Sequence, residues 1–588
     1  MQKPLLFVTS MFLVSSVPLS DAFAQNLSRA SDSILRDGFS DPDAGPYSDA
    51  DAARFLAQAT FGPTPGDIAD LRAQGYHAWL AKQEDATQTP PTHAKEYLAW
   101  LKTVDNNAST TTDGLMESWF LGALGGPDPA NANRVHSDQL RQRVAFALSE
   151  IFVTSDRLAV LYRNPESLYS YYDILTDDAF GNYRDLLKDV TLSPAMGGYL
   201  SMLNNQKPNA TYNIRPDENY AREILQLFSI GLVQLNGDGT TPLVSGQPIP
   251  TYDQSTVQGF ARIFTGWSYN GCTTGFWTDP LTQNCPPDFV DPMTPVEQYH
   301  DESDTKQLLS YSGTSGLTPA GGQAQADLDN ALDNVFNHPN VGPFISKQLI
   351  QRLVTSNPSP AYVARVATVF NNNGQGVRGD LRAVVDAVLL DREARSGQWL
   401  DPVHFGKVRE PLLRLTHFWR VLGARHYGGD GNPYRYTEYH PENVVDEAPL
   451  RAPSVFNFFR PDFAPKGEIA QVGLVAPEMQ ISTDSVTTEI TNTFNARIFY
   501  MNADRPNTTC GSAHPWGDVC VDLTQEALIA ADPQALVSRY DLLFLSGQMS
   551  PYMRTTLVNF LTSIHDNTKR VQYALSLILT SPEYLVQQ

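Results

Sequence analysis

Basic residues are scarce in this chain, and charged residues of either sign are few. The 588 residues include 42 Lys and Arg against 64 Asp and Glu, which gives a formal net charge of −22. Such a charge repels phosphate backbones, so nucleic-acid binding is not expected. Charged residues make up only 18% of the chain, and hydrophobic residues make up 41%. This composition is typical of a folded globular protein and excludes an acidic disordered one.

Long hydrophobic runs are lacking beyond the N-terminus, so no later segment is expected to span a membrane. The N-terminus has Lys3, then an apolar run over residues 5–17, and then Ala22-Phe23-Ala24. This order is typical of a secretory signal peptide, and a buried N-terminal helix is the alternative. We therefore expect residues 1–24 to be removed near Ala24 and residues 25–47 to form a flexible arm. The mature protein is then soluble and either periplasmic or secreted.

Cysteines number only four, and they fall into two locally spaced pairs. In an oxidising compartment such pairs form disulfides. Four cysteines allow three connectivities, and the short intervening loops favour pairing within each local pair. A four-thiolate zinc site is the alternative, but the C-x₂-C spacing is absent. The predicted disulfides are Cys272–Cys285 and Cys510–Cys520.

Several motifs with well-understood chemistry are also missing. The sequence contains no G-x-S-x-G, no H-E-x-x-H and no Walker loop. Residues 374–379 match G-x-G-x-x-G, but they follow a predicted helix, whereas a dinucleotide site requires a strand there. Residues 236–240 resemble part of a calcium loop without its closing Glu. We interpret both segments as turns.

Amphipathic helical patterns occupy most of the chain. Leu140, Val144, Leu148 and Ile151 recur at the three- and four-residue steps of a helix with one buried face. Further helices are predicted at 324–337, 343–355, 360–372, 380–394, 408–423, 533–546, 551–565 and 568–580. Neither a series of short alternating strands nor a fixed repeat is present. The sequence predicts a mainly α fold over residues 48–588, a large multi-helix orthogonal assembly.

Three irregular insertions interrupt these helices, at about 268–323, 424–482 and 500–523. The first has room for one small β-hairpin, and the predicted disulfides would brace the first and the third. The second is rich in aromatic residues, including Tyr434, Tyr436 and Phe456. Exposed rings can stack on sugars, although most aromatic residues belong to cores.

Polar candidates for a functional site occur first at residues 217–226. On a helix, Arg222 and Glu223 share one face, and Glu218 lies one turn before Arg222 in the favourable ion-pair order. A carboxylate held by a guanidinium can act as an acid, a base or a ligand. The alternative is a network that holds two helices together, or a solvated face.

A second candidate group lies in the first insertion and comprises His300, Asp301 and Lys306. Histidine titrates near neutrality, and a neighbouring carboxylate can orient it or join it as a metal ligand. His300 and Asp301 are therefore weak metal candidates. Adjacent residues of an extended segment point to opposite sides, however, which argues against joint action.

A third group runs from His404 through Lys407 and Arg409 to Glu410, just before a proline that starts a helix. Its basic side chains could hold an anion at the helix start. They could equally form bridges to an acidic neighbour.

Short motifs are distributed along nearly the whole mature chain, at residues 53–62, 191–196, 217–228 and 264–267, His300-Asp301 with Lys306, His338-Pro339, residues 450–459 and residues 581–584. Together they resemble the motifs of the bacterial family called domain of unknown function 1800. The resemblance implies a mostly helical, exported bacterial protein. Its members often look encoded beside an alkaline-phosphatase-like family, domain of unknown function 1501. The family has no established catalytic residue that could be assigned here.

Two functional hypotheses follow. The first is a periplasmic or secreted binding or accessory protein with a polar cleft, serving the envelope, an extracellular saccharide or polymer, or a co-exported phosphatase-like partner. The alternative is an extracytoplasmic, hydrolase-like enzyme that uses acid/base or metal-assisted chemistry. Its catalytic candidates would be Glu218, Arg222, Glu223, His300, Asp301 and Lys306. The sequence indicates no cofactor-binding residues and leaves the cofactor open.

Overall fold

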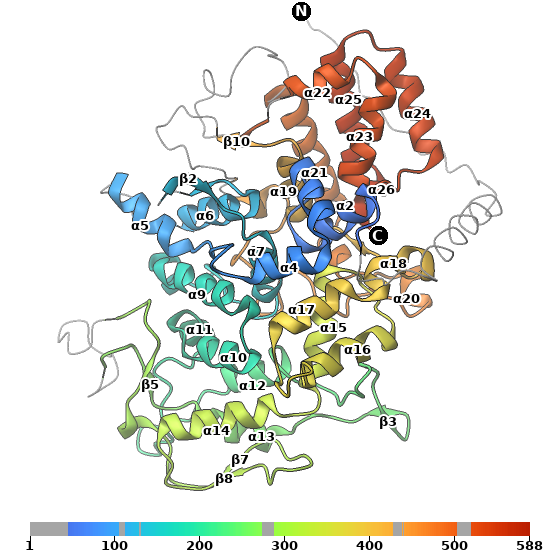
Figure 1. The fold of residues 1–588 in the computed structure, drawn as a ribbon. Helices are drawn as coiled ribbons and strands as arrows, with labels where there is room; N and C mark the ends of the chain where they lie inside the picture. Colours follow the sequence, from blue (N-terminus) through green and yellow to red (C-terminus); the bar gives the residue numbers. More distant parts are fainter. Residues whose placement is uncertain are drawn as a thin grey trace, which may run out of the picture.

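The computed structural model describes residues 45–104, 112–128, 131–272, 287–426, 438, 440–501, 519–521 and 523–588. The described chain is mainly helical, which confirms the predicted fold class (Figure 1). The predicted signal peptide and nearly all of the predicted arm lie outside the described residues. Among the described residues, no helix has both the length and the apolar character needed to cross a membrane.

The first half of the chain forms an upper and a lower group of helices in the view of Figure 1. Its helices begin at polar caps where the sequence indicates them; Thr64 and Asp67, for example, form a capping box at the start of α3. The helices are α2 (Asp49–Ala59), α3 (Pro65–Gln74), α4 (Tyr76–Glu84), α5 (Ala94–Val104), α6 (Thr112–Leu124), α7 (Gln139–Ser149), α8 (Ala159–Arg163), α9 (Glu166–Asp177), the 3₁₀ turn η2 (Asp178–Phe180), α10 (Tyr183–Leu192), α11 (Pro194–Tyr199), α12 (Asn219–Gln226) and α13 (Gln254–Ile263).

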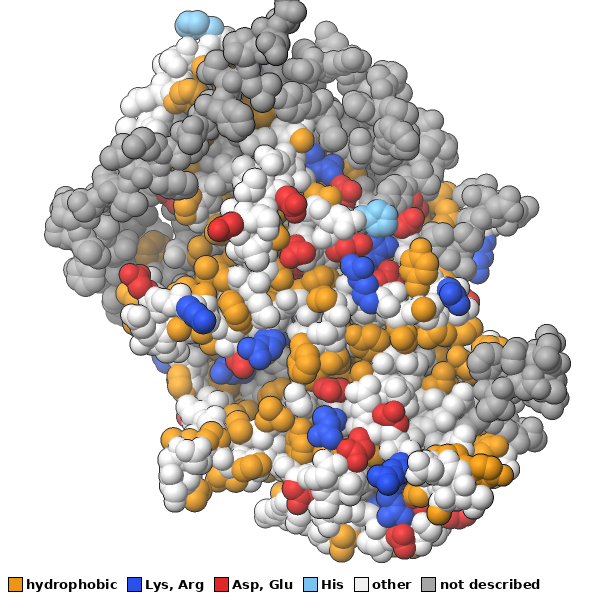
Figure 2. All heavy atoms as spheres, turned by 180° about the vertical axis from the view of Figure 1, so that it is seen from behind, with side chains coloured by type: hydrophobic (Ala, Val, Ile, Leu, Met, Phe, Trp, Pro, Cys, Tyr) orange, Lys and Arg blue, Asp and Glu red, His pale blue; other side chains and the backbone are white. Residues whose placement is uncertain are grey.

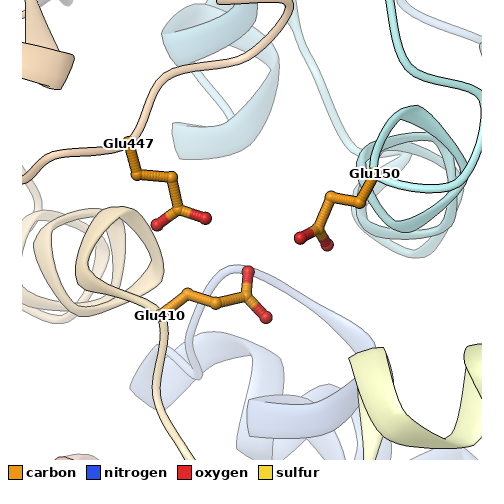
Figure 3. A group of neighbouring side chains, drawn as sticks. All are labelled: Glu150, Glu410 and Glu447. Carbon is orange, nitrogen blue, oxygen red and sulfur yellow. The ribbon is translucent and has the colours of Figure 1, made fainter. Parts of the chain in front are cut away.

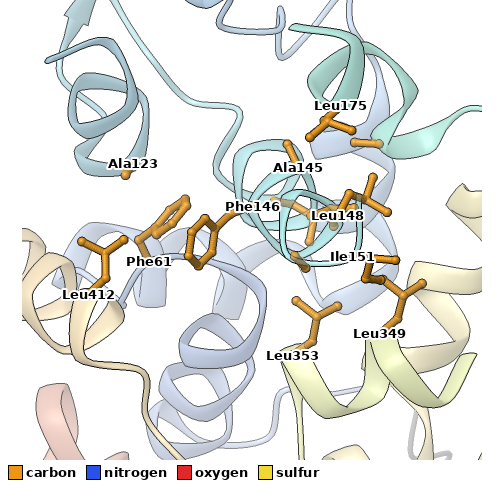
Figure 4. Packing of buried hydrophobic residues seen from close by; sticks show 14 of the residues in the cluster. Phe61, Ala123, Ala145, Phe146, Leu148, Ile151, Leu175, Leu349, Leu353 and Leu412 are labelled. Atoms are coloured by element: carbon orange, nitrogen blue, oxygen red, sulfur yellow. The ribbon is translucent and has the colours of Figure 1, made fainter. Parts of the chain in front are cut away.

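Helix α7 lies at the centre of the molecule. Every residue of this helix is buried, and it packs against helices from both halves of the chain. Phe146 contacts Phe61, with their ring centroids 6.3 Å apart. On the other side α7 packs against α15, whose Leu349 and Leu353 belong to the same buried cluster as Leu148 (Figure 4). Because α7 is buried on all sides, its polar residues must also find partners inside the protein.

The second half of the chain continues along the side of the molecule and ends in a helical group at the top of Figure 1. Its helices are α14 (Ala324–Phe336), α15 (Val341–Leu353), α16 (Pro360–Asn371), α17 (Leu381–Leu390), α18 (Arg392–Leu400), α19 (Pro411–Val421), α20 (Glu468–Gln471), α21 (Asp484–Ala496), α22 (Thr524–Ile529), α23 (Pro533–Leu545), α24 (Pro551–Thr562), α25 (Asn567–Leu579) and α26 (Pro582–Leu585). Shorter helical turns are η3 (Glu297–Tyr299), η4 (Pro441–Asn443), η5 (Pro477–Gln480) and η6 (Arg497–Met501).

Strands are short, and in the described part of the chain each belongs to a two-stranded antiparallel pair. The pairs are β1 (Pro127–Asp128) with β2 (Asn131–Val135), β3 (Leu243–Val244) with β4 (Gln247–Pro248), β5 (Trp267–Ser268) with β6 (Thr294–Pro295), β7 (Lys306–Gln307) with β8 (Leu317–Thr318), β9 (Lys407–Val408) with β12 (Val586–Gln587), and β10 (Arg425–His426) with β11 (Val519–Cys520). The β7–β8 pair lies in the first insertion, where room for a hairpin was expected. The β9–β12 pair holds Lys407 against the last residues of the chain.

Two predicted helix boundaries were wrong. The single helix expected at 380–394 is two helices, because Asp391 adopts an extended conformation and caps the start of α18. The helix expected at 408–423 starts only at Pro411, since Glu410 is extended. Residues 374–379 join α16 to α17, which confirms that the glycine motif is a turn between helices.

The predicted disulfides cannot be followed through the described residues. Cys285 and Cys510 lie outside them, and the side chain of Cys520 is not described either. Cys272 is buried, and none of the described cysteines is a free thiol. Both pairings therefore stay predictions.

Candidate metal centre

The first predicted polar group consists of Glu218, Arg222 and Glu223. It lies on α12, with Glu218 and Arg222 partly exposed at the protein surface. Arg222 Nη2 lies 3.0 Å from Glu218 Oε2, and the amide of Gln254 donates to the same carboxylate at 2.8 Å. Glu223 points inward and is buried, and this burial raises the pKa of its carboxyl. The expected Glu218–Arg222 ion pair is therefore present, but it is half exposed and ties α12 to α13.

The second predicted group is buried. Lys306 Nζ lies 2.6 Å from Asp327 Oδ2, and His300 Nε2 lies 3.2 Å from the same oxygen. Asp301 turns the other way and accepts a hydrogen bond from Arg262 at 2.5 Å. His300, Asp301 and Lys306 are each at most 1% exposed. They hold the first insertion to α13 and α14.

The two groups lie at different ends of α13. Gln254 at its start contacts Glu218, and Arg262 near its end contacts Asp301. Eight residues of helix separate these contacts by about 12 Å. Neither of the two cavities described below is lined by the predicted residues. The structure thus places them in two separate ion-pair networks.

The third predicted group leads to a different site. Lys407 Nζ donates to Glu410 Oε1 at 2.7 Å, to the backbone oxygen of Arg352 at 2.8 Å, and lies 3.1 Å from Glu478 Oε1. These contacts use all three ammonium protons, so Lys407 bridges acidic neighbours and has none left for an anion. His404, by contrast, pairs with Asp401 at the surface.

Glu410 belongs to a buried cluster of three glutamates, with Glu150 and Glu447. One carboxylate oxygen from each lies within 4.8 Å of the others. Figure 3 shows the three carboxylates pointing toward one another from separate segments. Glu150 is the C-cap of α7, Glu410 the N-cap of α19, and Glu447 lies on the irregular chain that follows η4. We call this group the three-glutamate centre.

Each glutamate uses one oxygen as a hydrogen-bond acceptor. Its other oxygen accepts no hydrogen bond, although Arg352 Nε lies 3.9 Å from Glu150 Oε2. Glu150 Oε1 accepts from the amide of Asn457 at 3.1 Å, and Glu447 Oε2 accepts from the backbone N–H of Leu412 at 3.0 Å. Glu410 uses Oε1 for Lys407. The buried atoms Glu150 Oε2, Glu410 Oε2 and Glu447 Oε1 accept no hydrogen bond. Burying an oxygen that accepts no hydrogen bond costs free energy. We therefore expect these three oxygens to bind protons or a cation.

Burial sets the protonation of the centre when no cation is bound. Desolvation, reinforced by the charge of Glu410, raises the pKa of Glu150 to about 8 and that of Glu447 well above its ordinary value. Burial opposes the charge on Lys407, but Glu410 and Glu478 outweigh it and raise the pKa of this lysine. Without a metal, therefore, protons occupy part of the centre.

The formal charges around the centre nearly balance. Four buried carboxylates face three buried cations, which leaves one negative charge in excess when all are ionised. The carboxylates are Glu150, Glu410, Glu447 and Glu478, and the cations are Arg143, Arg352 and Lys407. A divalent cation that displaces one proton changes this balance by only a single charge.

A small cavity adjoins the three-glutamate centre. Its lining includes Glu150, Glu447, Ser149, Thr154 and Asn457, and it leaves about 10 Å³ for the centre of a water-sized sphere. This is room for about one water molecule. Thr154 Oγ1 lies on this lining, is buried, and has no hydrogen-bond partner. A ligand of the size of an ion or a water would supply the missing partner.

The backbone beside this cavity is strained. Leu450 and Asn457 both line it, and they have positive φ angles of 53° and 62°. Such angles are uncommon for a residue like leucine and are found where the surrounding structure enforces them, often at functional sites. Here these backbone angles accompany the hydrogen bond that the Asn457 side-chain amide donates to Glu150.

The raised pKa of Glu150 predicts how the metal-free protein responds to pH. A folded state that binds more protons than the unfolded chain loses stability as the pH rises. Between pH 6.5 and 8, we expect Glu150 to lower the free energy of unfolding by up to about 2 kcal/mol. Urea denaturation with chelator at both pH values measures this change. Glu150→Gln, which cannot titrate, should show a smaller decrease, and an equal decrease in both proteins would contradict the assignment.

One of three comparisons with known proteins found a match. No curated protein and no solved structure matches the chain. The sequence does match the family described as protein of unknown function (DUF1800) over residues 54–586. This range includes all three glutamates of the centre and both networks of predicted residues. It also confirms the resemblance drawn from the sequence motifs, and the chain belongs to the DUF1800 family.

Proposed function

We propose that this protein is an exported binding protein whose fold is organised by one divalent cation at the three-glutamate centre. The observation that carries the proposal is the convergence of three buried carboxylate oxygens that accept no hydrogen bond. Carboxylate oxygens are the ligands that Ca²⁺, Mg²⁺ and Mn²⁺ prefer. The Thr154 hydroxyl lies beside the centre, and the adjoining cavity has room for one water, so both could supply further oxygen ligands.

The location of the centre favours an organising role for the cation over catalysis. The adjoining cavity accommodates about one water molecule, so a larger substrate has no access to the carboxylates. Residues 150, 410 and 447 are far apart in the chain, and a shared cation would fix three segments at once. Binding to the folded state alone raises stability in proportion to the logarithm of the metal concentration.

The exported location rests on residues 1–24, whose order of charge, apolar run and small residues is that of a signal peptide. Calcium sites of extracellular modules have dissociation constants of about 10⁻⁴–10⁻³ M. A centre of this kind would therefore fill outside the cytoplasm without high affinity. A co-exported phosphatase-like partner stays a prediction.

Metal analysis of the protein purified from its native compartment tests this proposal. We expect about one equivalent of a divalent cation, removable by a chelator, and a melting temperature that rises when Ca²⁺, Mg²⁺ or Mn²⁺ is restored. Calorimetric titration of the chelated protein gives the stoichiometry. If none of the three ions binds or changes the melting temperature, the proposal is wrong and protons alone fill the centre.

A further inference from the structure

A second, larger cavity opens to solvent on another part of the molecule, and the proposed cation site does not involve it. It is a cleft of about 620 Å³, within the range of small-molecule sites. Helix α4 and the loop after it, α7, η2 and α17 surround it, and α17 contacts α4 directly. Its lining includes Glu84, Asp85, Thr87, Gln88, Arg141, Asp177, Phe180 and Arg382.

Glu84, which lines the cleft, pairs with a buried carboxyl group behind the lining, that of Asp386. Glu84 and Asp386 lie within hydrogen-bonding reach of each other. Glu84 Oε1 and Asp386 Oδ1 are both buried and lack a donor, because two carboxylates have none to offer. One shared proton satisfies both atoms. Burial, followed by the charge of Asp386, raises the pKa of Glu84, which favours this protonated pair.

Two arginines form the donor side of the cleft. The Arg141 guanidinium stacks on the Phe180 ring at 4.7 Å, and its Nη atoms donate to backbone oxygens of Thr176 and Glu84. Its Nε is buried without an acceptor, and Arg141 is only 5% exposed. Arg382 is half exposed, with its Nε 3.8 Å from Glu84 Oε2. A buried guanidinium and a more exposed one thus line the same cleft.

The acceptor side consists of Asp85 and Asp177. Asp85 is half-buried and accepts hydrogen bonds from Thr87 and Gln88. Asp177 lies 2.7 Å from His93, and this contact raises the pKa of His93 to about 8, so the pair is close to neutral as a whole. With Glu84 protonated, charges of both signs almost cancel around the cleft. The opposite face of the molecule, shown in Figure 2, also carries both acidic and basic side chains.

We propose that this cleft binds a neutral, polyhydroxylated ligand, namely a segment of an uncharged oligosaccharide. Each sugar hydroxyl both donates and accepts, so it can donate to Asp85 or Asp177 while it accepts from Arg141 or Arg382. The two aspartates would repel an anionic ligand, and the two guanidinium groups would repel a cationic ligand. Arg141 Nε is a buried donor without an acceptor. A hydrogen bond from it to a ligand oxygen would therefore contribute most to the binding free energy.

Calorimetric titration with uncharged tetrasaccharides tests the proposal: maltotetraose, cellotetraose and N-acetylated chitotetraose, with trigalacturonate as the anionic comparison. We expect at least one uncharged tetrasaccharide to bind, and Arg382→Ala to weaken it about tenfold, the loss of one charged hydrogen bond. Arg392→Ala, another exposed arginine outside the cleft, is the matched control and should bind like the original protein.

Three outcomes would overturn the proposal: no binding of any uncharged tetrasaccharide, binding of trigalacturonate alone, or equal affinities in the two variants. Arg382 is exposed, so its replacement should leave folding intact, and circular dichroism verifies this. The same titration after chelation separates this site from the cation site, because the cleft shares no residue with the three-glutamate centre.

Discussion

Replacing Lys407 by methionine is expected to lower the free energy of unfolding by about 3–5 kcal/mol, the usual cost of leaving a buried charge without its partner. Lys407 is 3% exposed and contacts both Glu410 and Glu478. Methionine fills similar space but donates no hydrogen bond, so two buried carboxylates would lose their shared cation. Urea denaturation at pH 7 measures the difference.

Lys466→Met is the matched control for this prediction. Lys466 is exposed, and its replacement should change the free energy of unfolding by less than about 0.5 kcal/mol. The effect of Lys407→Met should also shrink as the pH falls, because burial raises the pKa of Glu478 and its protonated form no longer requires a cation. A loss below about 1 kcal/mol at pH 7 would show that Lys407 is not the main counter-charge of the centre.

Replacing Glu447 by glutamine is expected to weaken divalent-cation binding at least about 100-fold. Changes to residues that merely support a metal ligand already cost about 10–100-fold in affinity. Glutamine keeps the shape of the side chain and the bond from the Leu412 N–H, but removes one negative charge from the centre. Calorimetric titration of the chelated variant with Ca²⁺, Mg²⁺ and Mn²⁺ gives the affinity.

This variant separates cation binding from a purely structural role. Since burial favours the protonated form of Glu447, a neutral amide should leave the metal-free protein about as stable as before. A purely structural role would predict the reverse, a less stable protein with unchanged cation affinity. Glu468→Gln, at an exposed position outside the centre, should change neither quantity.

Much of the fold could be predicted from the sequence because its helices carry local signals. The capping box of Thr64 and Asp67 and the proline starts of α16, α23 and α24 all lie where the pattern indicates them. These signals act within one turn of helix and need no distant partner. Where a local cap such as Asp391 was overlooked, the prediction joined two helices into one.

The candidate site was less predictable because its members come from distant segments. Glu410 and Lys407 were recognised as a polar group, but with an anion as one possible ligand. Glu150 stands next to Ile151 at the end of the apolar stripe of α7, a placement that signals a buried carboxylate. Glu447 lies three residues before the motif that starts at Leu450. Neither position reveals that the two carboxylates meet.

The sequence by itself determined the helical class, the acidic composition, most helix starts and the family, because these depend on residue type and spacing within a few turns. Only the tertiary structure decided which ionisable groups converge. It separated Glu218 and Arg222 from His300 and Lys306 at two ends of α13, and it brought Glu410 together with two carboxylates that the sequence had not indicated, Glu150 and Glu447. The reason is physical: the energy of a buried charge depends on its neighbours in space, which lie hundreds of residues away along the chain.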